Sequence, residues 1–443
     1  MSSFFAEQAL LPDGWADNVS IEIDGGVISA VTERAVAGEG AIRLDGVVLP
    51  GLANAHSHAF HRALRSRTHA LGGSFWTWRD LMYSAALKLT PDSYHDLARA
   101  VFAEMLEAGF TAVGEFHYLH HDVDGTPFSE PNVMAEGLVA AADEVGIRIT
   151  LLDTLYLHGG LDADGYDPLG PNQIRFGDRS VDDYIERSQA LTPDSPLAAV
   201  GTAIHSVRAV DPESIEIVNE AFDRLVHAHV SEQPSENTQC LAAHGLTPTQ
   251  LLAETGTLKP SFTAIHATHL TAHDIALLSA GRGSVCFCPT TERDLADGIG
   301  PAAELWQAGV RLAVGSDSHA VIDPFEEMRA IEMHERLSSH ERGVFGSDDL
   351  LTGAAAHGYE SIGWTGGGRI AAGAPADLVC VRRDSNRLAG SDPSLAGDAI
   401  VFAAGADDVS DVIVAGRHVV REGVHVAVSV AAELDRTIAA LFA

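Results

Sequence analysis

Asn54-Ala55-His56-Ser57-His58 closes the first long apolar run of the chain. On an extended strand, side chains two residues apart point to the same face, so His56 and His58 can share one metal ion. Seven more apolar runs follow, several of them separated by helical segments. The eight runs end near His56, Glu115, Leu155, His205, His229, His266, Pro289 and Asp317. Eight apolar strands alternating with helices indicate a parallel sheet covered on both faces, and eight is the number that closes a (β/α)8 TIM barrel.

The ends of these runs carry the residue types that bind metals or transfer protons. In a barrel the C-terminal strand ends meet at one mouth, where active sites lie. The fifth run ends in His227-Ala228-His229-Val230-Ser231-Glu232, the sixth in Ile265-His266, and the eighth in Val314-Gly315-Ser316-Asp317. Each signal alone is weak in a chain with 22 histidines, but their conjunction indicates a metal centre. An open doubly wound sheet is the alternative, disfavoured because no GxGxxG segment follows the first run.

The two chain ends differ from this middle part. Short strands are predicted at residues 19–23, 27–31, 41–44 and 47–49, and again at 377–381, 409–414 and 418–421, before a helix from about Ala431. Glycines 366–368 mark a boundary. We therefore predict a barrel over residues 51–365 and a small β-sandwich domain built from residues 1–50 and 366–443. One barrel helix is well delimited, with Thr90 as N-cap, Pro91 in its first turn and Gly109 after its last residue.

Composition excludes several classes of protein. The 443 residues include 28 Lys+Arg and 62 Asp+Glu, a formal net charge of −34, and 46% are hydrophobic. That content excludes intrinsic disorder, and the charge argues against nucleic acid or an anionic membrane as partner. The sequence shows neither a signal peptide nor an apolar run long enough to span a bilayer, so the expected location is the cytoplasm.

Cysteine and lysine are scarce. Four cysteines in a chain of this length do not form a disulfide scaffold. Cys286 and Cys288 are two residues apart; a metal role is one alternative, but ordinary buried cysteines are favoured because no second pair accompanies them. Lysine occurs only at Lys88 and Lys259, so a mechanism that requires a lysine has two candidates.

The whole chain resembles the amidohydrolase superfamily, metal-dependent hydrolases and deaminases with a TIM barrel and a small β-domain made from both chain ends. Residues 368–379 (GRIAAGAPADLV) are similar to that family's return to the β-domain. Binuclear members usually bridge two metals with a carboxylated lysine on the fourth strand, and residues 201–208 contain no lysine. The resemblance therefore implies the mononuclear class and a homodimer, with one Zn²⁺, or alternatively Fe²⁺, held by His56, His58, His229 and Asp317.

Finer motifs resemble the formimidoylglutamate deiminases. They are the aromatic segment 74–83, expected as a loop, and residues 114–118, 205–210, 229–233 and 288–292. The resemblance implies hydrolysis of a linear amidine, N-formimidoyl-L-glutamate, to N-formyl-L-glutamate and ammonia in histidine degradation. It also implies that Arg79, Tyr118 and Arg208 hold the two substrate carboxylates, with His205 beside them. A small dicarboxylate suits this interpretation, because a guanidinium binds carboxylate bidentately and a dianion needs local positive charge in so acidic a protein.

One residue departs from that pattern. Where the family reads His-Ala-Phe-Gln, this chain has His58-Ala59-Phe60-His61. If His61 touches the substrate, the change from amide to imidazole alters affinity or specificity.

The expected mechanism assigns roles to three residues. Asp317 accepts the proton of the attacking water, His266 polarises or hydrogen-bonds the tetrahedral centre, and Glu232 carries a proton to the departing nitrogen. A strict strand would turn Glu232 away from the site, so the chain must leave β geometry just after His229.

Two other functions remain open at this point. Another mononuclear deaminase, acting on a nucleobase or aromatic amine, would share every metal ligand but would not need Arg79 and Arg208 together. A non-catalytic barrel that binds a partner is the second, and metal analysis without stoichiometric zinc or iron would favour it.

Overall fold

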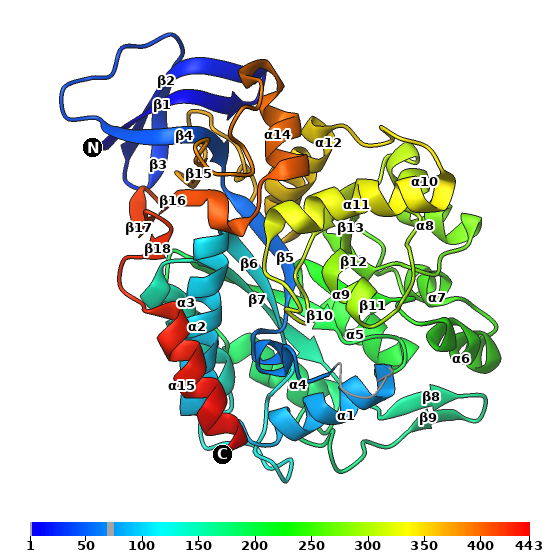
Figure 1. Ribbon diagram of the computed structural model, residues 1–443. Helices are drawn as coiled ribbons and strands as arrows, with labels where there is room; N and C mark the ends of the chain where they lie inside the picture. Colours follow the sequence, from blue (N-terminus) through cyan, green and yellow to red (C-terminus); the bar gives the residue numbers. More distant parts are fainter. Residues whose placement is uncertain (1, 69–74) are drawn as a thin grey trace.

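The computed structural model describes residues 2–68 and 75–443, and its centre is a barrel of parallel strands (Figure 1). Neighbours in the chain are neighbours in the sheet, from the first strand to the eighth. The strands are β5 (Leu52–Ser57), β6 (Phe110–His117), β7 (Arg148–Leu155), β10 (Ala198–Ile204), β11 (Val226–Val230), β12 (Phe262–His266), β13 (Ser284–Phe287) and β14 (Arg311–Val314). Asp317 N donates to His56 O (3.0 Å) and His58 N donates to Asp317 O (3.2 Å), which joins the eighth strand's end to the first. The predicted barrel is confirmed.

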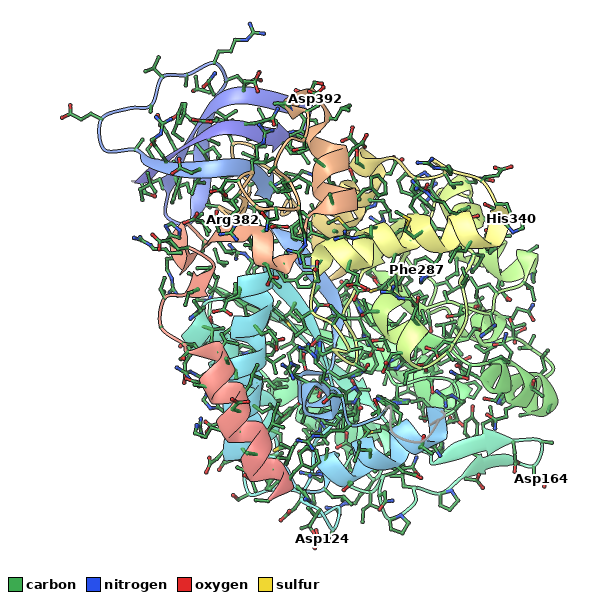
Figure 2. All side chains as sticks on the ribbon, in the orientation of Figure 1. Asp124, Asp164, Phe287, His340, Arg382 and Asp392 are labelled. Atoms are coloured by element: carbon green, nitrogen blue, oxygen red, sulfur yellow. The ribbon has the colours of Figure 1, made fainter. Side chains whose placement is uncertain are left out.

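Helices surround the barrel and cover part of its C-terminal mouth (Figure 1). They are η1 (Ala59–Leu64), α1 (Phe75–Ala86), α2 (Pro91–Ala108), α3 (Val133–Val145), α4 (Val181–Ala190), α5 (Pro212–Ala221), α6 (Pro234–His244), α7 (Pro248–Glu254), α8 (Ala272–Gly281), α9 (Pro289–Asp294), α10 (Ala302–Gln307), α11 (Pro324–Ser339), α12 (Ser347–Thr352), η2 (Gly353–His357) and α13 (Gly358–Ser361). Side chains fill the space between the layers; Phe287 lies inside, whereas Asp124 and Asp164 lie at the edge (Figure 2).

Helix α2 begins and ends as its sequence predicts. Thr90 Oγ1 accepts a hydrogen bond from Ser93 N, Pro91 is the first helical residue, and Gly109 ends the helix with φ 103°. The aromatic segment 74–83 was expected as a loop, and that expectation is wrong for most of it, because α1 begins at Phe75. Ser74 lies outside the described residues.

Both chain ends meet in a second sheet of eight strands. Its strands are β1 (Ser2–Leu11), β2 (Gly14–Asp24), β3 (Val27–Thr32), β4 (Ile42–Pro50), β15 (Leu378–Val381), β16 (Val409–Val414), β17 (Arg417–Arg421) and β18 (Val424–His425). Pairing of β4 with β15 joins the N-terminal strands to the C-terminal ones. Strand β1 was not predicted, because a register shift between Ala6 and Gln8 disturbs its alternation of buried and exposed residues.

The remaining elements lie between or beyond these two sheets. They are the hairpin β8 (Gly160–Asp162) and β9 (Gly165–Asp167), with η3 (Pro393–Leu395), α14 (Ala396–Ala403), η4 (Ala406–Asp408) and α15 (Val430–Phe442). Helix α15 lies along α2 of the barrel, where Arg436 Nη1 is 3.1 Å from Asp96 Oδ2 (Figure 1). The domain division at residues 50 and 366 stays a prediction. Among the described residues, no helix combines the length and apolar character needed to cross a membrane.

A buried ion pair ties the barrel to the second sheet. Arg148 of β7 contacts Asp377 through Nε to Oδ2 (2.6 Å) and Nη2 to Oδ1 (3.0 Å). Tyr359 Oη and Ala415 N donate to the same carboxylate, each at 2.7 Å. The Asp377 carboxylate therefore accepts four hydrogen bonds from three separate segments of the chain. These bonds fix the barrel and the second sheet relative to one another.

Replacing Arg148 by Met should destabilise the fold strongly. The substitution leaves the Asp377 charge buried without its cation, which typically costs about 3–5 kcal/mol. Urea unfolding followed by circular dichroism measures the loss, with Arg43→Met, an exposed arginine of β4, as the control that should change stability by less than about 0.5 kcal/mol. Equal stability of the two variants would contradict this role of the pair.

Candidate active site

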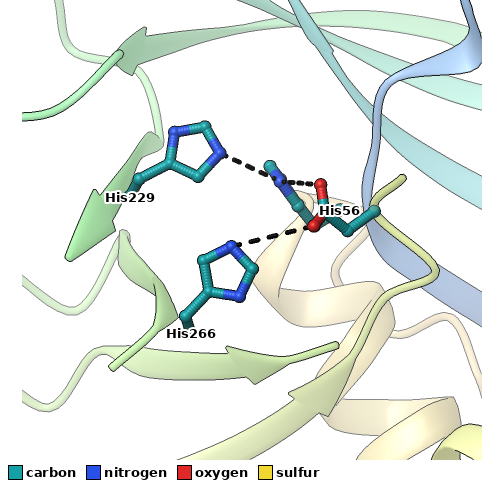
Figure 3. A group of neighbouring side chains, drawn as sticks. His56, His229 and His266 are labelled. Carbon is teal, nitrogen blue, oxygen red and sulfur yellow. Dashed lines mark hydrogen bonds and ion pairs between the residues drawn. The ribbon is translucent and has the colours of Figure 1, made fainter. Parts of the chain in front are cut away.

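The four predicted metal ligands converge at the C-terminal mouth of the barrel. His56 lies in β5 and His58 directly follows that strand, His229 lies in β11, and Asp317 follows β14. Asp317 Oδ1 lies 3.3 Å from His56 Nε2 and 3.4 Å from His58 Nε2, and the Nε2 atoms of His56 and His229 are 3.2 Å apart. All four residues are buried. Figure 3 shows the rings of His229 and His266 directed at His56 and the adjacent carboxylate.

Hydrogen bonds on the far side of two rings decide where their lone pairs point. His58 Nδ1 lies 2.9 Å from Phe116 O, and His229 Nδ1 lies 2.8 Å from His205 O. A carbonyl oxygen only accepts, so each Nδ1 carries the proton and each Nε2 turns a lone pair to the site. Burial, the largest influence on each, lowers the pKa of His56, His58 and His229, so the rings are neutral. Neutral imidazoles and a carboxylate facing one point are a donor set for a divalent cation.

Left-handed backbone at the strand ends brings His266 and Glu232 into the same mouth. Ser231, directly after β11, has φ 52°, and His266 and Ala267 have φ 67° and 52°. His266 Nε2 lies 3.8 Å from both Glu232 Oε1 and Asp317 Oδ2. The turn that Glu232 requires after His229 is therefore present. Backbone strain of this kind persists where surrounding structure enforces it, and it clusters at functional sites.

The charges of these three residues differ. Burial raises the pKa of Glu232, so this carboxyl can hold a proton. Burial opposes the ionisation of Asp317, but the neighbouring histidines lower its pKa well below its usual range. Burial also opposes a charge on His266, yet Glu232, Glu292 and Asp317 raise its pKa well above the usual value. Groups whose environments move their pKa values apart suit separate roles in proton transfer.

A cavity of about 330 Å³ opens above the ligand cluster. The five predicted substrate residues all line it: His61, Arg79, Tyr118, His205 and Arg208. His61, which departs from the family pattern, lies with its Nε2 2.9 Å from Oη of Tyr118, a residue that matches the pattern. This contact fixes the His61 ring in the wall of the cavity. The hairpin β8–β9 contributes residues 160–162 and Asp167 to the wall of the cavity.

Comparison with known proteins places this site in a family. The model of the Amidohydrolase family matches residues 47–419, and that of the formimidoylglutamate deiminase HutF N-terminal domain matches residues 1–43. A formimidoylglutamate deiminase of Pseudomonas aeruginosa is 40% identical over 449 residues, covering 96% of each chain. The chain belongs to the amidohydrolase family. It is accordingly a hydrolase of C–N bonds in a metal-dependent family.

Other relatives of this amidohydrolase are more distant. A 5-methylthioadenosine/S-adenosylhomocysteine deaminase of Natronomonas pharaonis is 29% identical and covers 91% of this chain and 88% of its own. The crystal structure of an amidohydrolase from Brucella melitensis has a TM-score of 0.92 at 34% identity, with both chains covered in full. An adenosine deaminase from Xanthomonas campestris with bound zinc shares the fold, with a TM-score of 0.84 at 24% identity and 98% and 96% coverage.

No lysine or cysteine is among the described residues that line the cavity of this amidohydrolase, although Cys288 Sγ lies within 4.8 Å of ligand atoms of His266 and Glu292. The fourth strand, β10, contains no lysine, and both Lys88 and Lys259 are exposed, away from the cavity. The four cysteines are buried and free, as favoured from their spacing. Burial raises the pKa of Cys288 well above its usual value, which keeps it a neutral thiol and a poor ligand.

Sequence reasoning missed three residues that support the site. Glu292 Oε1 lies 3.3 Å from His266 Nδ1, and Glu236 Oε2 lies 3.8 Å from Arg208 Nε. Tyr156 lines the cavity, and its ring centroid is 4.4 Å from that of His205. Glu292 belongs to the motif 288–292 identified in the sequence, but the sequence did not predict its contact with His266. Nothing local marks Glu236 or Tyr156, because both depend on contacts between distant segments.

A second group of buried ligand-type residues lies outside the mouth. Ring nitrogens of His117 and His120 and an oxygen of Asp153 lie within 4.8 Å of one another. Arg187 Nη1 is 2.8 Å from Asp153 Oδ1, and Arg187 Nη2 is 2.9 Å from Asp178 Oδ2. Asp153 is thus already paired with a cation, which explains the cluster as part of the barrel wall.

The histidines of that wall should make stability depend on pH. Burial lowers the pKa of His120 to about 4 from 6.5, and His120 Nε2 lies 2.8 Å from Thr154 O. Between pH 6.5 and 4 the unfolded chain binds a proton that the folded chain does not, so the free energy of unfolding falls as pH falls. Urea unfolding between pH 7 and 5 should show a shallower pH dependence in His120→Gln than in the wild type, by at most about 1.4 kcal/mol per pH unit. Parallel curves would contradict this assignment.

Proposed function

We propose that this amidohydrolase hydrolyses N-formimidoyl-L-glutamate to N-formyl-L-glutamate and ammonia, a step of histidine degradation. The observation that carries the proposal is the pair of arginines, Arg79 and Arg208, in the cavity above the ligand cluster. A guanidinium recognises a carboxylate with two parallel hydrogen bonds, and the substrate carries two carboxylates. The 40% identity to the deiminase of Pseudomonas aeruginosa supports the same substrate.

Two guanidinium groups act on one part of the cavity. Both arginines lower the pKa of Tyr83, although burial raises it overall, so both act on the same part of the cavity. Tyr118 also lines the cavity, with its ring centroid 5.2 Å from that of His58, and its hydroxyl can donate to a carboxylate oxygen. A formimidoyl group at the ligand cluster and a glutamate moiety towards the arginines would use both ends of the cavity.

We assign one Zn²⁺ to His56, His58, His229 and Asp317. When bound, the ion activates water at neutral pH as a Lewis acid. Asp317, held ionised, takes the proton of the attacking water, while His266 faces the developing tetrahedral centre through Nε2. Glu232 retains a proton and delivers it to the departing nitrogen, which leaves as ammonia. His266 Nε2 lies 3.8 Å from an oxygen of each carboxylate, so the three groups can act on one reacting group beside them.

Removing the metal should abolish turnover without unfolding the barrel. The hydrogen-bonded frame of His58 and His229 does not need the ion, because both Nδ1 atoms are anchored to backbone carbonyls. Dialysis against a chelator should lower kcat by at least about 10³-fold, and one equivalent of Zn²⁺ should restore it, since the ion supplies several kcal/mol of transition-state stabilisation. Elemental analysis and circular dichroism accompany the assay; full activity in metal-free protein would refute the metal's role.

A truncated substrate tests the two-carboxylate interpretation. N-Formimidoylglycine keeps the reacting group and loses the side-chain carboxylate. If both arginines bind carboxylates, its kcat/KM should be lower than that of N-formimidoyl-L-glutamate by about 10- to 100-fold, the value of one charged hydrogen bond. Equal kcat/KM values would contradict the proposal.

A further inference from the structure

His266 is held from behind by a carboxylate that the mechanism above does not use. Glu292 Oε1 lies 3.3 Å from His266 Nδ1 and accepts a hydrogen bond from Cys288 N at 2.8 Å. Both Glu292 and His266 are buried, with 2% and 1% of their surface exposed. The two nitrogens of the His266 ring therefore face different partners, Nδ1 the carboxylate and Nε2 the reaction space.

This contact keeps a proton on Nδ1 of His266. A carboxylate oxygen accepts hydrogen bonds, so the Nδ1 of His266 is the donor in the contact. Only Nε2 is then available to the reacting group, and it already lies between Glu232 and Asp317. A base or electrophile oriented by a third group is a recurrent arrangement in hydrolases, because it fixes tautomer and ring angle together.

The element that carries Glu292 is itself anchored to the metal-ligand strand end. Glu292 lies on the short helix α9, whose Thr291 Oγ1 accepts from Ser318 N (3.1 Å) and lies 3.2 Å from Ser316 O. These two residues flank Asp317. Helix α9 therefore sets the position of His266 relative to Asp317, and Glu292 is its contact to the imidazole.

We propose that Glu292 is a positioning residue for catalysis: it keeps a proton on Nδ1 of His266 and directs Nε2 at the bond that breaks. The proposal rests on the proposed hydrolytic function, in which His266 faces the tetrahedral centre. Loss of such an outer partner typically costs 10- to 100-fold in activity. The cost falls on kcat, because Glu292 does not line the cavity and does not touch the substrate.

A matched variant separates positioning from support of helix α9. Glu327 on α11 is also buried and holds the same helix, accepting from Thr290 N at 3.0 Å and from Thr290 Oγ1 at 2.5 Å. It has no contact with His266 among those that the structure describes. Glu327→Gln therefore weakens α9 without altering the imidazole, whereas Glu292→Gln removes the charge that faces Nδ1.

The experiment compares both variants as metal-loaded enzymes with N-formimidoyl-L-glutamate. We expect Glu292→Gln to lower kcat by about 10- to 100-fold with KM within about twofold and metal content unchanged, and Glu327→Gln to leave kcat within about twofold. In a His266→Gln background, Glu292→Gln should have no further effect, since its action passes through the imidazole. Full additivity of the two substitutions, or equal losses in the two glutamate variants, would overturn the proposal.

Proton NMR tests the contact between Glu292 and His266 independently of which substrate the enzyme hydrolyses. In the wild-type protein, proton NMR should show a protected imidazole Nδ1–H signal that His266→Gln removes. Glu292→Gln should shift or broaden that signal and Glu327→Gln should leave it in place. If the wild type releases no ammonia from N-formimidoyl-L-glutamate, the proposed function fails, while the NMR comparison still decides the contact. A signal unaffected by Glu292→Gln would refute the positioning role.

A second variant covers the case in which Glu292→Gln does not fold. Glu292→Asp keeps the charge and shortens the side chain, and it should lower kcat less than His266→Gln does. An equal loss of kcat in these two variants would likewise contradict the positioning role.

Discussion

Asp317→Asn is expected to lower kcat by about 10²- to 10⁴-fold while the barrel stays folded, because an amide cannot accept the proton of the attacking water. The substitution is isosteric, and the backbone hydrogen bonds of Asp317 to His56 and His58 do not involve its side chain. Steady-state ammonia release at saturating Zn²⁺ measures the effect, and elemental analysis of the same sample shows whether the ion is retained.

The control for Asp317→Asn is Asp274→Asn, the same substitution at a buried carboxylate outside the cavity lining. Asp274 is buried in the first turn of α8, accepts from Thr271 N at 2.7 Å and from Thr247 Oγ1 at 2.5 Å, and does not line the cavity. Asp274→Asn should cost stability, about 1 kcal/mol, and leave kcat within about twofold. Near-normal turnover in Asp317→Asn, or an equal loss in Asp274→Asn, would contradict the assigned proton acceptor.

Arg79→Met and Arg208→Met form the second large prediction. Each should raise KM for N-formimidoyl-L-glutamate by about 10- to 100-fold, because a charged hydrogen bond to carboxylate contributes about 1.5–3 kcal/mol. Arg208→Lys should recover only part of the loss, since an ammonium lacks the planar fork. Initial-rate kinetics over a wide range of substrate concentration gives KM and kcat separately.

An unchanged KM in both arginine variants would indicate a different class of substrate. Arg43→Met, remote from the cavity, removes the same charge and should leave KM unchanged. If Arg79→Met and Arg208→Met also left KM unchanged, the cavity would not be a dicarboxylate site. A deaminase of a nucleobase, which shares the metal ligands, would then be the better explanation.

Much of this architecture was predictable because its signals are local. Eight apolar runs and a cap at Thr90 belong to continuous segments. The shared face of His56, in β5, and His58, directly after it, follows from extended backbone geometry. The barrel topology then brings His229 and Asp317 to the same mouth without further information. The family resemblance supplied the residues proposed to bind substrate, all of which line the cavity.

What escaped prediction depends on contacts between distant segments or on irregular backbone. Strand β1 contains a register shift, so its burial pattern is not the alternation that identifies a strand. The partner of His266 is Glu292, 26 residues away, and no spacing rule links a strand end to the first turn of a later helix. Helix α1 was expected as a loop because of its aromatic residues, although Phe75, Trp78, Met82 and Ala85 follow the apolar periodicity of a helix.

Ammonia release by the zinc-loaded enzyme from N-formimidoyl-L-glutamate, with guanine and cytosine measured under the same conditions, tests the proposed reaction. We expect rapid release from N-formimidoyl-L-glutamate, with N-formyl-L-glutamate formed in equal amount, and a kcat/KM at least about 10³-fold lower for either base. Release from guanine or cytosine with none from N-formimidoyl-L-glutamate would contradict the proposed reaction.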